Sequence, residues 1–408
     1  MAQRTGPQVY DCVIAGGGLV GLIQAIALAR HGFAVAVVDA RPAETVLAPA
    51  FDGRASAFAF AGIKLFTALG IWPRLHNEAQ PILEIRVTDG PSRLFVHFDH
   101  RAIGDQPLGH MLENRHIRLA LHEVAAATPG LDFYAPATVE GVEFSAGHGT
   151  LALADGRRLK GRLVIAADGR ASPLRHAAGI GVAAWAYPQT GIVATVHHAQ
   201  PHGGIAHERF LAAGPFAILP LTGRRASIVW TARADQAPVI LGLDERGFAA
   251  ELARRFGDFL GPLEVEARRW SYPLAFHHAH RYQAERLVLI GDAAHGIHPI
   301  AGQGLNLGLK DVAALTEVLV DAARLGRDIG TLGVLERYAR WRRTDTLLLS
   351  AATDGLNRLF SNDSAPLRLA RDLGLGLVNR LPPAKRLFMA HARGTLGRLP
   401  RLLKGELV

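Results

Sequence analysis

The sequence predicts a mixed α/β (α+β) fold, in which a parallel-sheet frame carries an inserted mixed β-sheet and ends in a C-terminal helical segment. Short apolar runs followed by glycine turns and helical stretches occur near the start, in the middle and late in the chain. Such strand–turn–helix units are typical of parallel sheets. Between residues 185 and 273 the pattern changes to alternating, strand-length segments broken by Gly and Pro, which indicates a second sheet.

Length and composition indicate a globular protein of two or three domains. The chain has 408 residues, of which 49% are hydrophobic and 20% are charged, as in ordinary folded proteins. Its one cysteine, Cys12, lies in an apolar run. A disulfide framework is therefore excluded, and a reduced cytoplasmic setting is expected.

The net charge of +9 comes mainly from scattered arginines. No basic run is interleaved with aromatic residues, so a nucleic-acid partner is not expected. The apolar stretch 13–29 follows Asp11 and is interrupted by Gln24. It is shorter than the roughly 20 residues that span a bilayer, and it lacks the basic start and cleavage site of a signal peptide. We interpret it as part of a folded domain.

The first glycine turn predicts a Rossmann-like dinucleotide-binding unit. A strand over Val9–Ala15 is followed at once by Gly16-x-Gly18-x-x-Gly21, and the helical run "LIQAIALARHG" ends at Gly32. The strand "AVAVVDA" comes next, with Asp39 at its end. Glycines at these spacings permit a tight turn, backbone approach to a pyrophosphate and close packing of helix on strand. An acid about twenty residues later suits the ribose hydroxyls.

Four further features lie in the first 182 residues. Asp52-x-Arg54 is expected just before a helix that runs to about residue 69, and a hairpin is expected around a turn at residues 90 and 91. An amphipathic helix opens near Asn114. A later apolar strand ends in Asp168-Gly169.

These patterns divide the chain into three predicted parts. Residues 1–80, 105–182 and 280–345 form a discontinuous nucleotide-binding domain. Residues 81–104 and 183–279 form a substrate-binding β-sheet domain, and residues 346–408 form a C-terminal helical segment.

The second glycine turn follows a buried strand over residues 287–290. Gly291-Asp292 ends that strand, and a long helix is expected from around Gly304 to about residue 325. Asp292 could accept hydrogen bonds from ribitol hydroxyls, and free N–H groups near Gln303 to Asn306 could stabilise negative charge. A helix start with an incidental aspartate is the alternative reading.

No metal site is predicted. The histidines gather at His277, His278 and His280, and again at His295 and His298, without cysteines or carboxylates at ligand spacings. A Gly-x-Ser-x-Gly elbow is also missing, so a hydrolase is not indicated.

Taken in order, Gly16-x-Gly18-x-x-Gly21, Asp168-Gly169 and Gly291-Asp292 resemble the group A flavin monooxygenases, which have the fold of p-hydroxybenzoate hydroxylase. The resemblance covers essentially the whole chain. The segments "DGRASAFA", "LENRHIRLAL" and "GDAAHGIHPIAGQGLNLGLKD" are similar to those of the ubiquinone-biosynthesis hydroxylases, which act on polyprenyl phenols.

The resemblance implies FAD as the cofactor, held at both glycine turns. The residues implied for its ADP half are Gly16, Gly18, Gly21 and Asp39. Those implied for other cofactor contacts are Arg54, Asn114, Asp168, Gly169 and Asp292. Those implied for the isoalloxazine ring are Gly302, Gln303, Gly304, Leu305 and Asn306, with Pro299 facing the reacting edge. Pro299 and Arg54 are also the candidate catalytic residues.

The resemblance further implies a reaction. Flavin reduced by NAD(P)H or another reductant would capture O₂ as a C4a-hydroperoxide and hydroxylate a polyprenyl phenol at ring carbon 1 or 5, as a 2-polyprenyl-6-methoxyphenol hydroxylase would. Two alternatives stay open: hydroxylation of a soluble phenol, and a non-catalytic flavoprotein scaffold among other ubiquinone-biosynthesis proteins. A flavin halogenase is not expected, because no Trp-x-Trp-x-Ile-Pro segment is present.

The C-terminal residues 366–408 are basic and leucine-rich. They could lie on an anionic bilayer, dock to partner proteins or pack on the flavin domain. The expected location is the cytoplasm, with peripheral contact at the inner face of the cytoplasmic membrane as an open alternative.

Overall fold

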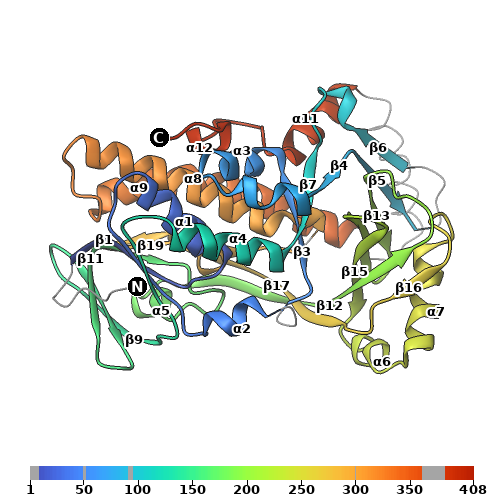
Figure 1. The fold of residues 1–408 in the computed structure, drawn as a ribbon, viewed down its shortest axis with the longest axis horizontal. Helices are drawn as coiled ribbons and strands as arrows, with labels where there is room; N and C mark the ends of the chain where they lie inside the picture. The colour runs from blue at the N-terminus through green and yellow to red at the C-terminus, as the bar shows by residue number, and fades with distance from the viewer. Residues whose placement is uncertain (1–8, 49–51, 91–94, 299, 361–381) are drawn as a thin grey trace.

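The computed structural model describes residues 9–48, 52–90, 95–298, 300–360 and 382–408. Within them, two large sheets lie at opposite ends of an elongated molecule, and long helices join the two ends (Figure 1). No helix among the described residues combines the length and apolarity that a membrane span needs. The mixed α/β fold with an inserted sheet is confirmed.

The first sheet is built on parallel strands, as the first glycine turn predicted. Its central register pairs Cys12 with both Val35 and Leu163. The strand order is β18 (Gln283–Ala284), β19 (Leu287–Leu289), β11 (Arg158–Ala166), β1 (Val9–Ala15), β2 (Val35–Val38) and β8 (Leu131–Tyr134). Two antiparallel strands, β10 (Gly149–Leu153) and β9 (Val139–Phe144), extend it beside β11.

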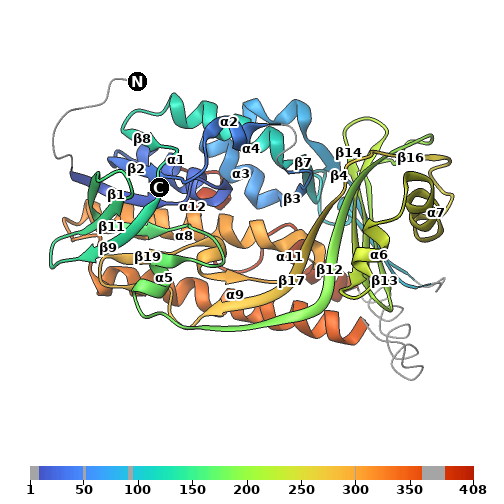
Figure 2. The same cartoon turned by 90° about the horizontal axis from the view of Figure 1, so that it is seen from below.

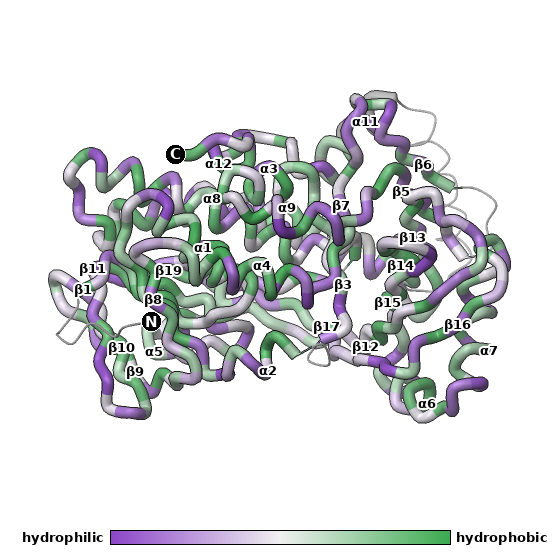
Figure 3. Tube along the Cα trace, in the orientation of Figure 1, coloured by the Kyte–Doolittle hydropathy of each residue, from purple (hydrophilic) through white to green (hydrophobic). Residues whose placement is uncertain are grey.

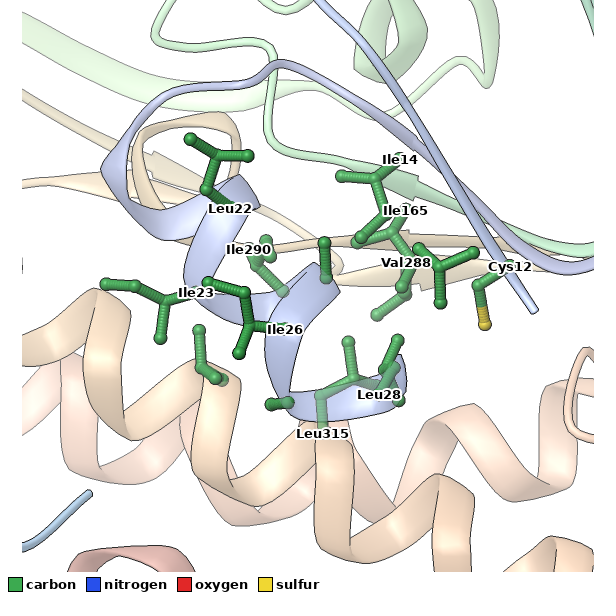
Figure 4. Close-up of a cluster of buried hydrophobic side chains, with 14 of the residues drawn as sticks. Cys12, Ile14, Leu22, Ile23, Ile26, Leu28, Ile165, Val288, Ile290 and Leu315 are labelled. Carbon is green, nitrogen blue, oxygen red and sulfur yellow. The ribbon is translucent and has the colours of Figure 1, made fainter. Parts of the chain in front are cut away.

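Helix α1 (Leu19–Arg30) is buried between this sheet and helix α8 (Gln303–Arg324) (Figure 4). Leu22 and Ile26 of α1 are at most 1% exposed, and Leu315 of α8 is fully buried. Burying one such side chain contributes about 1.5–3 kcal/mol. Apolar residues therefore fill nearly the whole length of α1, and the tube is green along this layer in Figure 3.

A three-stranded sheet connects the two ends. It contains β3 (Ala55–Ala59), β7 (Gly109–Glu113) and β4 (Gln80–Ile82), and β3 is followed by α3 (Phe60–Ala68). The expectation that Arg54 immediately precedes a helix is therefore wrong, because β3 pairs with β7 and separates Arg54 from α3. Helix α4 (Asn114–Ala126) begins where it was predicted.

The second large sheet is mixed. Its order is β20 (His295–Gly296), β17 (Trp270–Ala279), β12 (Val182–His198), β15 (Arg225–Arg233), β14 (Gly214–Leu221), β13 (Ile205–Leu211), β5 (Glu84–Asp89) and β6 (Phe95–Asp99), with β16 (Leu263–Val265) also on β12. Strands β12 and β17 run from beside the parallel-sheet layer into this sheet (Figure 2). The hairpin β5–β6 was predicted, but the parallel pairing of β5 with β13 was not.

The two faces of the mixed sheet differ. The outer face packs against α7 (Glu245–Phe256), where Phe248 and Phe256 are fully buried beside Trp230, and α6 (Ala237–Leu241) lies nearby. The inner face faces the rest of the molecule. Since side chains alternate along a strand, every second residue of β13, β14 and β15 faces inward.

The C-terminal elements are α9 (Leu332–Phe360), α11 (Pro382–Ala392) and α12 (Arg401–Lys404). Helix α9 is continuous across residues 345 and 346, where the sequence analysis predicts a boundary between the nucleotide-binding domain and the C-terminal segment. Near the C-terminus, Leu402 and Leu403 are buried, and the Arg401 N–H donates to Glu317 of α8 at 2.7 Å. The sequence left three alternatives for the C-terminal residues: bilayer contact, docking to partner proteins and packing on the flavin domain. For residues 401–403, the structure shows packing on the flavin domain. The prediction for residues 361–381 falls outside the described residues.

Candidate functional site

One continuous cavity of about 1670 Å³ connects the glycine turns with the inner face of the mixed sheet. It is lined by Gly16, Gly18, Gly21, Asp39, Arg54, Asn114, Asp168, Gly169, Asp292, Gly302, Gln303, Gly304, Leu305 and Asn306. The structure therefore brings together these predicted site residues from distant parts of the sequence. Pro299 lies outside the described residues.

The first glycine turn is as tight as its motif predicts. Gly16 has φ +104°, and a Cβ there would lie 2.2 Å from the carbonyl oxygen of Ala167. A Cβ on Gly21 would lie 1.9 Å from the carbonyl oxygen of Gly16. Gly18, by contrast, is the N-cap of α1 and faces open space. No side chain caps α1, so its first N–H groups are free for an anion.

Asp39 closes this end of the cavity. Its carboxylate accepts hydrogen bonds from the N–H of Gly17 and the N–H of Arg41, both at 2.8 Å. Each carboxylate oxygen keeps further acceptor capacity, and the residue lines the cavity. It can therefore accept hydrogen bonds from a ligand that occupies this end of the cavity.

Arg54 and Asn114 meet at Asp52. Asp52 is 5% exposed and forms a bidentate pair with Arg54, at 3.0 and 2.9 Å. It also accepts hydrogen bonds from Asn114 at 3.2 Å and Arg118 at 3.1 Å. Burial opposes ionisation, but the hydrogen bonds and charge of Arg54 outweigh it and lower the pKa of Asp52 to about 2. The fixed carboxylate holds the Arg54 and Asn114 side chains at the cavity wall.

The Asp168-Gly169 turn lies directly beside the first glycine turn, since a Cβ on Gly16 would lie 3.0 Å from the backbone nitrogen of Asp168. Asp168 Oδ2 accepts the N–H of Leu174 at 3.2 Å, while Oδ1 is buried without a hydrogen-bond partner. Burial raises the pKa of Asp168. Arg175 donates to the carbonyl oxygens of Arg170 and Ala293, at 2.9 Å each, and so ties this turn to Gly291-Asp292.

The second glycine turn is fixed from three sides. The N–H of Gly291 donates to Asp311 of α8 at 3.0 Å, and His277 of β17 donates to the carbonyl of Asp292 at 2.7 Å. Asp311 is fully buried and also bonds His295 at 2.6 Å and Arg342 of α9 at 2.7 Å. Burial raises the pKa of Asp311, but the His295 and Arg342 charges and hydrogen bonds lower it further, so the net direction is down.

The N-terminus of α8 is anchored to β3. Asn306 accepts from the N–H of Ala59 at 3.0 Å and donates to the carbonyl of Ala57 at 2.8 Å. Gly302, with φ +61°, precedes the helix, and no side chain caps it. Gly304 faces open space in the cavity. A second helix N-terminus without a side-chain cap therefore lies at the same cavity as α1.

These features fit FAD. Two uncapped helix N-termini suit the diphosphate and the negative charge of a reduced flavin, and the partnerless Asp168 oxygen suits a hydroxyl donor. Gly18 and Gly304 leave room for close approach by the cofactor. The contribution of each residue to cofactor binding remains a proposal.

Histidines from both predicted groups have hydrogen-bond partners in the structure. His277 bonds Asp292, His278 bonds Tyr282 at 2.9 Å, and His295 bonds Asp311. Among the described residues, Glu84, His97 and Asp99 also lie close together, but Arg86 and Arg101 pair with the two carboxylates. The absence of a metal site stays a prediction.

Sequence reasoning missed three residues that the structure makes prominent. Asp52 was noted only as a neighbour of Arg54, Asp311 only as the last letter of a motif, and Glu208 not at all. A signal for Glu208 was present in the sequence. Ala206, Glu208 and Phe210 are every second residue of a predicted strand, so they share one face, and Glu208 is a charged residue between two apolar ones.

The comparisons with known proteins agree with the geometry. A family model described as "FAD binding domain" matches residues 9–344. The chain is 49% identical to a ubiquinone hydroxylase, UbiL, of Rhodospirillum rubrum, over 99% of this chain and 96% of that protein. It is 35% identical to the 3-demethoxyubiquinol 3-hydroxylase of Escherichia coli, over 95% of this chain and 99% of that protein.

Among solved structures, the p-nitrophenol 4-monooxygenase PnpA of Pseudomonas putida superposes with a TM-score of 0.80. The alignment covers 96% of this chain and 99% of that one, at 19% identity, and shows the shared fold. The chain belongs to the FAD-binding-domain family and, within it, to the ubiquinone-biosynthesis hydroxylases, which are FAD-dependent monooxygenases.

Proposed function

We propose that this protein adds one hydroxyl group to the aromatic ring of a polyprenyl phenol, at ring carbon 1 or 5, during ubiquinone biosynthesis. The proposal rests mainly on one observation. A single cavity joins the uncapped N-termini of α1 and α8, which suit FAD, to a largely apolar chamber. NAD(P)H is the proposed electron donor and O₂ the oxygen source.

FAD, when bound, supplies the reduction of O₂ and the transfer of one oxygen atom. The protein's own residues bind and orient the reactants. The turns at Gly18 and Gly304 fix the two ends of the cofactor, and Asp52 fixes the Arg54 and Asn114 side chains beside it. Val87, Val193 and Val229 of the mixed sheet line the chamber with apolar surface that excludes water from the ring.

The isoprenoid tail has a matching exit. Leu359 of α9 and Phe388 of α11 line the cavity and are 40% and 51% exposed. Both side chains therefore extend from the cavity lining to the surface. We propose that the tail leaves here, and that the same opening takes substrate from the inner face of the cytoplasmic membrane by peripheral contact.

Disrupting the gene in its host and profiling quinone intermediates by mass spectrometry tests the proposal. We expect a prenylated phenol that lacks one ring oxygen to accumulate, and its structure identifies the carbon that this enzyme hydroxylates. A plasmid copy of the wild-type gene should restore the profile. An unchanged quinone profile in the disrupted strain would contradict the proposed function.

A variant that binds FAD more weakly distinguishes the enzyme from the scaffold alternative. Gly18→Ala places a methyl group in the open space at the α1 N-terminus without a clash in the protein. We expect this variant to accumulate normally and to fail in complementation. Full complementation by a FAD-free variant would favour the scaffold reading.

A further inference from the structure

The chamber on the mixed sheet carries one carboxyl group in an otherwise apolar row. Across six paired strands, Glu208 of β13 stands in register with Val193, Val229, Ala217, Val87 and Val96. All six residues line the cavity. Glu208 has Val87 on one side and Ala217 on the other, and Ala206 and Phe210 are its inward-facing neighbours along β13.

No described residue forms a hydrogen bond or ion pair with the Glu208 carboxyl. Its strand neighbours point to the other face, where His207 packs against Phe259 and Arg209 donates to the carbonyls of Arg255 and Phe256. Helices α9 and α11 contribute no described titratable side chain to the cavity lining. A part-buried carboxyl among apolar residues and without a protein partner is costly to maintain, so a substrate group is its natural partner.

Glu208 also lies close to the cofactor end of the chamber. Phe210, two residues along the same face, packs against Ile300, which immediately precedes the Gly302 turn. Two residues along a strand span about 6–7 Å, which is the width of an aromatic ring with its substituents. A ring placed beside Phe210 on this face can therefore direct a hydroxyl group at the Glu208 carboxyl.

We propose that Glu208 is a catalytic residue that accepts the hydrogen bond of the substrate's phenolic hydroxyl and takes its proton during hydroxylation. This inference rests on the proposed function. The O–H bond breaks, the proton passes to the carboxylate, and the electron pair left on oxygen enriches the ring carbons ortho and para to it. One atom of O₂ bonds to such a carbon, and the other leaves as water after taking up two electrons, which NAD(P)H would supply through FAD, and protons from the donor and solvent. The ring hydrogen leaves as a proton and restores aromaticity, and Glu208 returns its proton to the phenolic oxygen.

The surroundings of Glu208 suit this role. Burial in the apolar chamber raises its pKa to about 7, where a general base works best near neutral pH. The carboxylate form, which accepts the proton, predominates above that pKa and is lost as the pH falls below it. Among the other ionisable residues of the lining, His207 adjoins Glu208 on β13 and packs against Phe259. Arg54, Asp168 and Asp292 belong to the glycine-turn end of the cavity.

The test uses purified FAD-loaded enzyme with 2-geranylphenol as substrate. For the wild type, we expect kcat/KM to rise as the pH passes through about 7 and then to level off. Glu208→Gln should lower kcat on the order of 10²- to 10⁴-fold and remove this rise. Glu208→Asp should restore part of the rate and the pH dependence. Glu264→Gln, an exposed glutamate on β16 of the same sheet, should behave as wild type.

A binding measurement adds a readout that does not depend on turnover. By calorimetric titration at pH 8, the wild type should bind 2-geranylphenol roughly tenfold more tightly than its O-methyl ether, because a hydrogen bond to a charged acceptor is lost in the ether. In Glu208→Gln the ratio should fall toward one.

If the wild type is active and Glu208→Gln keeps the wild-type rate and pH profile, the role assigned to Glu208 is wrong. The proposed function is not affected by that result. If Glu208→Gln fails to retain FAD, Glu208→Asp decides, since wild-type kcat and pH profile in that variant would equally overturn the role assigned to Glu208. A wild type that converts no prenyl phenol would instead count against the proposed function.

Discussion

Replacing Asp311 by asparagine is expected to lower the free energy of unfolding by about 3–5 kcal/mol. Asp311 is fully buried and bonds Arg342, His295 and the N–H of Gly291 together. Asparagine keeps the volume but removes the negative charge, so the buried Arg342 guanidinium loses a counter-ion. Urea unfolding at pH 7 measures the change.

A matched control lies on the same helix. Asp321 pairs with Arg401 at 2.7 Å, with both side chains about one-third exposed. Asp321→Asn should cost under about 1 kcal/mol, because water screens an exposed ion pair. Equal losses in the two variants would contradict the structural role given to Asp311.

The Asp311 contribution should also depend on pH. Because its pKa is lowered in the folded protein, the stabilisation is present above the unfolded carboxyl pKa, near 4, and is lost as the pH falls toward the folded value. The stability difference between wild type and Asp311→Asn should therefore shrink below about pH 4.

Single methyl groups at the glycine turns should separate folding from cofactor binding. Gly21→Ala puts a Cβ 1.9 Å from the carbonyl oxygen of Gly16, so the turn must move, and both stability and FAD content should fall. Gly18→Ala and Gly304→Ala meet no protein atom within 4 Å. These two variants should keep the thermal unfolding midpoint of the FAD-free wild type.

If one FAD reaches both turns, each of Gly18→Ala and Gly304→Ala should weaken FAD binding by at least roughly tenfold, or about 1.4 kcal/mol. The ratio of flavin to protein absorbance after purification, followed by FAD titration of the stripped protein, measures this. Normal FAD affinity in Gly304→Ala would show that the second turn does not hold the cofactor.

Local patterns carried the prediction of the nucleotide-binding frame. The first strand, Gly16 to Gly21, helix α1 and Asp39 lie within about thirty residues, and each obeys a local steric rule. Strand β3 was missed because "ASAFA" is alanine-rich, and only its pairing with β7, some fifty residues later, makes it a strand. Because β3 was missed, Arg54 was wrongly predicted to lie immediately before a helix.

The site's polar network depends on contacts that no local pattern shows. Asp52 meets Arg118 across 66 positions, and Asp311 meets Arg342 from the next helix. The apolar surroundings of Glu208 can be recognised only from the strand register, which places it among alanine and valine residues of five other strands. Resemblance of motifs was sufficient to predict the cofactor-binding residues. The substrate chamber could be identified only from the three-dimensional fold.

The most direct test of the central claim follows the oxygen atom. Purified enzyme loaded with FAD is incubated with 2-geranylphenol, NADPH and ¹⁸O₂, and the product is analysed by mass spectrometry. We predict a hydroxylated geranylphenol that carries one ¹⁸O atom and forms only when both FAD and the reductant are present. Retention of FAD without any hydroxylated product, or a product whose new oxygen comes from water, would contradict the account.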